Sequence, residues 1–138
     1  MSECFICAKH AAMPPTVLTA EEHVVIAHLP GDDVYLGYLF VEARRHVSGL
    51  GDLTADEAAA VGRAAARWSR ALQAVTGADH VYAAVIGHGV DHFHLHLIPR
   101  YPGTPREFWW TRVDEWPDAP RGGEAEIIAL LDRLRETV

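Results

Sequence analysis

The sequence lacks the features of a membrane-spanning, secreted or disulfide-rich protein. Its longest apolar runs extend over about seven residues, whereas a membrane helix needs about 20. The first ten residues, MSECFICAKH, contain no basic segment followed by an apolar one, so we expect no signal peptide. Two cysteines are too few for a disulfide framework. These absences favour a cytoplasmic protein.

Positive charge is also scarce. The chain has 12 lysines and arginines against 19 aspartates and glutamates, so its formal net charge is −7. Tight binding to the backbone of DNA or RNA needs clustered cations, and this balance argues against it. Hydrophobic residues make up 49% of the 138, too many for a disordered chain. We therefore expect one globular domain over residues 1–138, without repeats or linkers.

The order of strand and helix signals predicts an antiparallel α+β fold. A turn sequence, PGDD, separates the first two strand-like runs, and Pro99 is expected to end the last one. Residues 99–123 contain five of the eight prolines and are expected to extend over the surface. The expected strands cover residues 24–29, 34–41, 80–86 and 92–98.

Two helices complete this fold. Thr54 and Glu57 form a capping box that opens a helix with an apolar stripe, and Gly77 is a typical residue for its end. The last helix is expected over residues 124–134, with acidic residues early and arginines late, as the helix dipole favours.

Five of the nine histidines lie between His80 and His96, and three of these alternate along one expected strand. Because side chains alternate between the two faces of a strand, His92, His94 and His96 share a face, about 7 Å apart. Phe93, Leu95 and Leu97 share the other face and are able to pack on a helix.

This row of imidazoles adds little to stability, so it predicts a function. The histidines fit metal ligation, nucleophilic attack, or general acid–base catalysis near neutral pH. The alternative is a polar face that points to solvent, which is rare for three histidines in strict alternation.

A second motif, Cys4-x-x-Cys7, has the spacing of two thiolates on one tetrahedral metal. Such a site needs two further ligands. The alternative is two buried, unreactive cysteines beside Phe5 and Ile6. A thioredoxin-like site is not expected, because the three residues before Cys4 leave no room for a preceding strand.

The stretch HFHLHLI, residues 92–98, resembles the signature of the histidine-triad (HIT) family and is followed by Pro99 and Arg100. Residues 37–57 resemble the family's strand, basic residues, histidine and helix start. The cysteine pair resembles the opening of many bacterial members, and the similarity extends from residue 4 to about residue 105. The resemblance implies a five-stranded antiparallel sheet with two helices, usually a homodimer, acting on nucleoside phosphates.

The resemblance also implies residue roles. His94 would attack the α-phosphorus and form a nucleotidyl-histidine intermediate that water resolves. His92 and His96 would bind phosphate oxygens or protonate the leaving group. The chemistry itself would need no cofactor. Zinc-carrying relatives imply a structural zinc site made of Cys4, Cys7, His46 and His92.

The chain departs from the family's pattern at the expected substrate contacts. His88 and Gly89 stand where many members have residues that contact the phosphates, and His28 stands in place of a ribose-binding aspartate. Arg100 either neutralises phosphate or pairs with a surface acid. The tryptophans either cap the active site or pack at the dimer interface: Trp109, Trp110 and Trp116.

These observations favour a nucleotide hydrolase or transferase that cleaves phosphoanhydride or phosphoramidate bonds, with a small nucleotide as its partner. Two alternatives stay open, a metal-dependent hydrolase with the histidine triad as ligands and a nucleotide-binding regulatory module without turnover. No nucleic-acid or membrane partner is expected. We expect a homodimer in which the apolar strand over residues 80–86 is covered.

Overall fold

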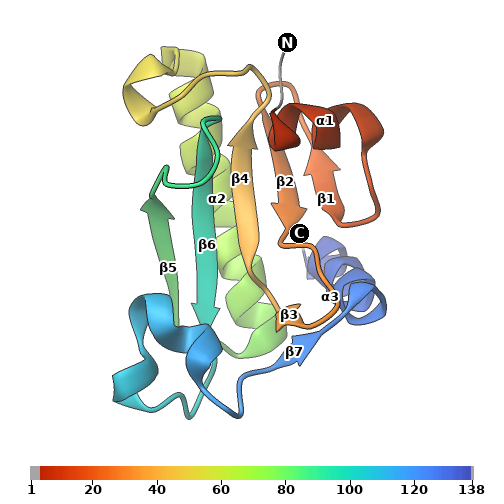
Figure 1. The fold of residues 1–138 in the computed structure, drawn as a ribbon, viewed down its shortest axis with the longest axis vertical. Coiled ribbons are helices and arrows are strands. Elements are labelled where there is room, and N and C mark those ends of the chain that lie inside the picture. Colours follow the sequence, from red (N-terminus) through yellow and green to blue (C-terminus); the bar gives the residue numbers. More distant parts are fainter. Residues whose placement is uncertain (1–3, 138) are drawn as a thin grey trace.

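The computed structural model describes residues 4–137 (Figure 1). Its centre is a five-stranded antiparallel sheet with the order β1-β2-β4-β6-β5, and a separate antiparallel pair is formed by β3 and β7. The α+β fold with a five-stranded antiparallel sheet is therefore confirmed. The strands are β1 (Val17–Ala20), β2 (Val24–His28), β3 (Val34–Tyr35), β4 (Leu39–Ala43), β5 (His80–Val85), β6 (His94–Arg100) and β7 (Arg121–Gly122).

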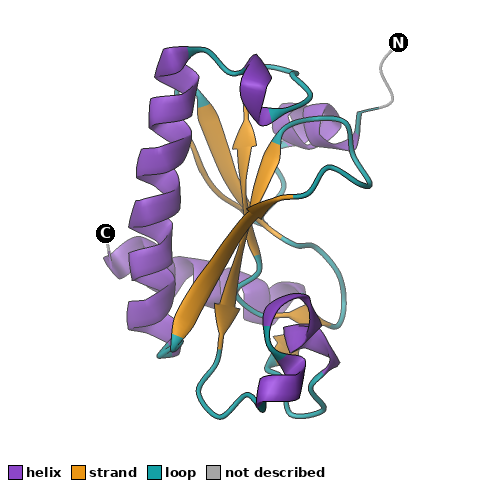
Figure 2. Ribbon diagram, turned by 90° about the vertical axis from the view of Figure 1, so that its left-hand side faces the viewer, coloured by secondary structure: helices purple, strands orange, loops and turns teal. Residues whose placement is uncertain are grey.

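Helices α2 (Ala55–Thr76) and α3 (Glu124–Thr137) cover one face of the sheet, as Figures 1 and 2 show. Burial of apolar side chains holds this layer together, because α2 and α3 pack their stripes on the same buried cluster as the sheet. The sequence predicted both helices. Thr54 and Glu57 exchange the expected capping hydrogen bonds, and Gly77 ends α2 with a φ of 73°.

The opposite face carries α1 (Phe5–Ala12) and, near the other end of the sheet, two 3-10 helices (Figure 2). Sequence analysis missed α1, since eight residues with a weak apolar stripe give little periodicity. Cys4 caps it by accepting a hydrogen bond from the Cys7 N–H at 3.3 Å. The 3-10 helices on this face are η2 (Arg106–Phe108) and η3 (Trp110–Glu115), and η1 (Leu50–Asp52) precedes α2.

Residues 99–123 are not the extended surface segment that the sequence predicted. They contain η2, η3 and β7, and they bury Val113 and Ala119 against Tyr35 and Ile98. Without a regular hydrophobic period, short 3-10 turns leave no signal in the sequence.

The histidine strand is displaced by two residues from its expected bounds. It begins at His94 and continues through Pro99 to Arg100. The Arg100 carbonyl accepts a hydrogen bond from the Asp79 N–H, on the β5 side of β6. Because backbone groups alternate between the two sides of a strand, the backbone polar groups of Pro99 face the β4 side. The pairing of β4 with β6 ends at Leu97, before Pro99. Proline is tolerated there because no ladder hydrogen bond needs its missing N–H.

The expected strand over residues 34–41 is divided into β3 and β4 by a turn at Gly37, whose φ is 94°. A Cβ at Gly37 would lie 2.8 Å from the Pro99 ring, so close approach also favours glycine. β4 still lies antiparallel to β2, as expected.

β5 forms one edge of the sheet, and β6 is its only neighbour within the described residues. Its last residue, Val85, and the following Ile86 are apolar and exposed, with 40% and 37% of their surfaces accessible to solvent. None of the described helices has the length and apolar composition needed to cross a membrane.

Candidate active site and metal site

His94 and His96 project from β6 onto the sheet face that carries α1. In the register with β4, His94 lies opposite Glu42 and His96 opposite Phe40. The two imidazole centroids are 5.0 Å apart, and each ring contacts the Phe40 ring edge-on. The pair therefore forms a compact imidazole surface beside α1, as alternation along a strand predicts.

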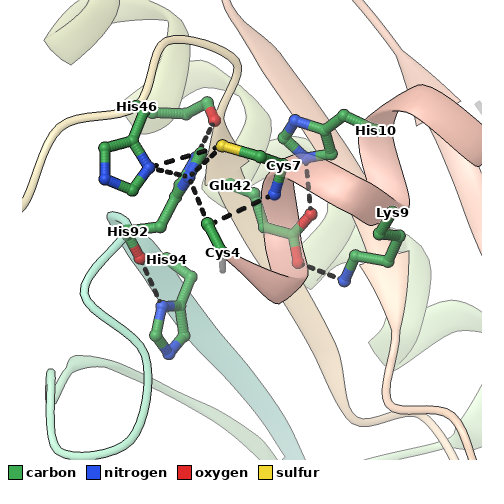
Figure 3. A network of polar contacts seen from close by, with 9 residues as sticks. Cys4, Cys7, Lys9, His10, Glu42, His46, His92 and His94 are labelled. Carbon is green, nitrogen blue, oxygen red and sulfur yellow. Dashed lines mark hydrogen bonds and ion pairs between the residues drawn. The ribbon is translucent and has the colours of Figure 1, made fainter. Parts of the chain in front are cut away.

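A single hydrogen bond fixes the protonation pattern of neutral His94. Its Nδ1 lies 2.7 Å from the backbone carbonyl of His92, which only accepts, so Nδ1 carries the proton (Figure 3). A neutral imidazole has one N–H, which leaves the lone pair of Nε2 available. This is the arrangement that a nucleophilic histidine needs.

His96 is held by a residue that sequence analysis missed. The Tyr38 hydroxyl lies 2.8 Å from Nδ1 of His96, while Nε2 is buried without a hydrogen-bond partner in the described part of the chain. Burial, together with the nearby His94, lowers the pKa of His96 to about 4. His96 is thus neutral near pH 7. Tyr38 alternates in phase with Phe40 and Glu42 on the approach to β4, a signal in the sequence that could have found it.

We expect acid to destabilise the fold through its buried histidines. Burial lowers the pKa of His28 and His96 below their ordinary value of 6.5, so the unfolded chain binds more protons than the native one between about pH 6.5 and pH 4. The free energy of unfolding should fall as the pH falls through this range, by at most about 1.4 kcal/mol per pH unit for each histidine. Urea unfolding at several pH values measures this slope, and His96→Asn should make it shallower. An equal slope in wild type and variant would contradict the assignment to His96.

The second cluster joins the N-terminal segment to the histidine strand. Its four ligand atoms all lie within 4.8 Å of one another, and Nδ1 of His46 is 3.1 Å from Nδ1 of His92. The sulfurs lie 3.4–3.5 Å from imidazole nitrogens. Bonds of about 2.0 Å to nitrogen and 2.3 Å to sulfur put neighbouring ligands of a tetrahedral metal about 3.3–3.8 Å apart. This Cys2His2 group, which suits a metal ion, consists of Cys4, Cys7, His46 and His92.

His92 belongs to both clusters. Its Nε2 donates to the Ala43 carbonyl at 2.6 Å, so Nδ1 is unprotonated and faces the cysteines. Burial lowers the pKa of His92, which favours the neutral form that ligates metals. The carbonyl of the same residue holds His94. His92 lies just before β6, so its imidazole serves the metal-binding group while its backbone orients the ring of His94.

A cavity of about 190 Å³ opens beside His94. Its polar lining comes from Lys9, Glu42 and His94, and sequence analysis missed the first two. The charged Glu42 within an otherwise apolar strand is a sequence signal for that position. A larger hollow of about 790 Å³ lies between α2, the end of α3 and the turn from β1 to β2, is lined mainly by alanines and arginines, and contains no histidine. The apolar lining of the cavity beside His94 comes from Phe5, Ile6, Leu29, Pro30, Phe40 and Val90.

The expected substrate contacts differ in their placement. His88 and Gly89 are exposed in the loop that precedes β6, and the next residue, Val90, lines the cavity. This loop therefore borders the site.

His28 is placed differently from the expected ribose contact. In the register of β2 with β4 it lies opposite Leu39, on the face covered by helices and away from His94. It is fully buried, with Nδ1 donating to the Leu29 carbonyl and Nε2 accepting from the Gly37 N–H. Both nitrogens are used, so His28 stabilises the turn between β2 and β4.

Arg100 lies at the wrong end of β6 for a phosphate on His94 of the same chain. Six residues separate the two, about 20 Å of strand. Its guanidinium stacks on Trp109 at 3.7 Å and donates to the Tyr82 hydroxyl at 2.9 Å. These contacts within one chain are with aromatic groups and include no surface acid, and a phosphate contact by Arg100 stays a prediction. Trp110 lies beside this group, 5.1 Å from the Tyr82 ring, and Trp116 packs with the smaller buried cluster.

Comparisons with known proteins agree with this geometry. The chain is similar in fold to crystal structures of a hypothetical histidine triad nucleotide-binding protein from Sulfolobus tokodaii (TM-score 0.75, 20% identity, covering 97% of this chain and 91% of that one). It is also similar to a Zn-bound histidine triad family protein from Mycobacterium smegmatis (TM-score 0.73, 20% identity, covering 98% and 95%). Comparison with curated proteins gives no match. The family model of the HIT domain matches residues 12–103, so the chain belongs to the histidine-triad family.

Proposed function

We propose that this protein is a nucleotide hydrolase or transferase that cleaves phosphoanhydride or phosphoramidate bonds through a nucleotidyl-histidine intermediate on His94. One observation carries the proposal. The hydrogen bond from Nδ1 of His94 to the His92 carbonyl directs the lone pair of the neutral imidazole to Nε2, on a residue that lines the cavity. The similar Sulfolobus tokodaii protein is described as nucleotide-binding, which supports a nucleotide as the substrate class.

The steps follow from the two imidazoles. Nε2 of His94 attacks the α-phosphorus, a P–N bond forms, and the bond from phosphorus to the leaving group breaks. With the Tyr38 hydroxyl donating to Nδ1 of His96, the N–H of neutral His96 is on Nε2, where it would donate a hydrogen bond to the leaving group while that group takes its proton from water. A water molecule then attacks the phosphorus, the P–N bond breaks, and the proton of the attacking water passes to solvent. His88 and Gly89 in the bordering loop would contact the phosphate oxygens.

We also propose that the Cys2His2 group holds a structural zinc ion and that residues 1–138 form one domain. Two thiolates and two neutral imidazoles are the ligand set of closed zinc sites. When bound, the ion supplies a cross-link between the start of α1 and the residues around His92. A single apolar cluster that includes residues from Leu18 to Leu134 supports the single domain.

A metal-dependent hydrolase with the triad as ligands is less well supported. Within residues 4–137, the group suited to a metal contains His92 but neither His94 nor His96. Nδ1 of His92 faces the cysteines, while Nδ1 of His94 is used by a carbonyl.

Trapping the intermediate tests the function. The protein should be incubated with a nucleoside 5′-phosphoramidate, denatured rapidly above neutral pH and examined by mass spectrometry. A nucleotidyl group on the peptide containing His94, formed without added metal, is the expected result. A regulatory module without turnover would bind the nucleotide but give no adduct. Absence of both adduct and hydrolysis over a panel of nucleotides would contradict the proposal.

We predict that the protein is a homodimer that pairs through β5. Two copies related by a two-fold axis at this edge would cover the exposed Val85 and Ile86. Antiparallel pairing would also bring Arg100 and Trp110 of one protomer toward the His94 end of its partner. Light scattering at micromolar concentration should give twice 15.2 kDa. Sedimentation at the mass of one chain under these conditions would exclude this dimer.

A further inference from the structure

The cavity beside His94 contains the only lysine of the chain. Lys9 is one of 12 basic residues counted as lysine or arginine, and the other 11 are arginines. It lies on α1, and only 5% of its side chain is accessible to solvent. Lysine is rarely buried unless it is paired, so this position needs an explanation.

Glu42 pairs with Lys9, and each of its two carboxylate oxygens has a partner. One carboxylate oxygen lies 2.5 Å from Nζ of Lys9, and the other accepts from Nε2 of His10 at 2.9 Å (Figure 3). The ammonium group has three N–H donors, whereas the structure gives it one oxygen acceptor among the described residues. Lys9 therefore retains donors that a ligand in the cavity is able to satisfy, but Glu42 has no oxygen without a partner.

The walls of the cavity suit a flat, apolar-faced group. The rings of Phe5 and Phe40 lie 5.6 and 5.7 Å from Nζ of Lys9, and the remaining walls are mainly aliphatic. A phosphate would lose its hydration here against a single cation already paired with Glu42. A nucleobase buries its faces against such walls and keeps its polar edge for hydrogen bonds.

We propose that Lys9 is a specificity-determining residue that donates a hydrogen bond to a carbonyl oxygen on the edge of the substrate's base. The inference rests on the proposed function, since it concerns the base of a nucleotide attacked by His94. A 6-oxopurine has this carbonyl oxygen at position 6. Adenine has an amino group there, so a hydrogen-bond donor of the base would face the ammonium donor of Lys9. Glu42 does not compensate, because only 1% of its side chain is accessible to solvent and both of its oxygens are turned to Lys9 and His10. An unpaired buried donor is costly, and this cost discriminates between the bases.

The test compares inosine 5′-phosphoramidate with adenosine 5′-phosphoramidate, which carry an oxo and an amino group at the same ring position. We expect the wild type to favour the inosine compound at least about ten-fold in kcat/KM. In the double variant Lys9→Met with Glu42→Gln this ratio should fall to about one, since the donor is lost and the buried carboxylate is not left uncompensated. Lys9→Arg, which keeps a cationic donor, should retain part of the preference.

Two controls separate this effect from general damage to the cavity. Ile6→Leu changes the shape of the cavity wall without touching the ion pair, so kcat/KM for the two compounds should change together and their ratio should stay as in the wild type. Thermal unfolding of the double variant shows whether α1 stays docked. Equal rates for the two compounds in the wild type, or a preference that survives the double variant, would overturn the inference and leave the proposed function intact.

A binding measurement tests the inference without turnover. Because Lys9 is the only lysine, protein labelled with ¹³C,¹⁵N-lysine gives one side-chain ammonium signal in NMR spectra. Inosine monophosphate should shift this signal clearly more than adenosine monophosphate does. If no nucleotide is hydrolysed, the proposed function fails, and the lysine signal still decides the inference. A signal unmoved by inosine monophosphate overturns it.

Discussion

Replacing His94 with asparagine should abolish turnover of nucleoside phosphoramidates and leave the fold intact. Asparagine lacks the nucleophilic nitrogen, so the covalent route is lost, and we expect a decrease in kcat of several orders of magnitude. The side chain is only partly buried at the edge of the cavity, so its loss should change the free energy of unfolding little. Steady-state hydrolysis, circular dichroism and nucleotide binding measure the three quantities.

His23→Asn is the matched control for this variant. His23 lies between β1 and β2, where its imidazole is 3.8 Å from the neighbouring Glu22 carboxylate. This variant should keep wild-type turnover, and nucleotide binding by the His94→Asn protein should remain within a few-fold of the wild type. Near-normal turnover by a pure His94→Asn sample would exclude the covalent mechanism.

Local sequence signals were sufficient to predict the ends of α2 and the shared face of His94 and His96. Capping by Thr54 and Glu57 and the left-handed Gly77 fixed both ends of α2, because caps depend on residues a few positions apart. Alternation placed His94 and His96 on one face for the same reason. The Cys2His2 group was implied by the family resemblance, and the structure brings its four ligand atoms together.

The positions of His28, Arg100 and Lys9 depend on contacts between residues that are far apart in the sequence. His28 was expected near the ribose, yet its pairing with Leu39 puts it on the opposite sheet face from His94. Arg100 follows the histidines closely in sequence, but a strand carries it about 20 Å away. Lys9 was missed because its partner is 33 residues distant. Pairing of strands and docking of α1 are tertiary events that local periodicity does not encode.

Removal of the expected zinc should lower the stability of the fold substantially. Purified protein should contain about one zinc per chain, and Cys4→Ser or His46→Asn should lower both the zinc content and the melting temperature. Two thiolates and two imidazoles held this closely have little to stabilise them without an ion, and metal binding contributes directly to the free energy of folding. Metal analysis and thermal unfolding, with and without a chelator, measure the effect, and His23→Asn should change neither.

The effect should extend to catalysis, because His92 ligates with its imidazole and holds His94 with its carbonyl. Loss of the ion leaves His92 with the bond to Ala43 as the main restraint on its ring, so the orientation of His94 should loosen. We therefore expect His46→Asn to lower kcat more than nucleotide binding, although His46 itself does not line the cavity. Protein purified without chelators that contains no zinc, with both thiols titratable, would exclude the site. A stable, zinc-free His46→Asn variant with unchanged kcat would show instead that the ion and the nucleophile are independent.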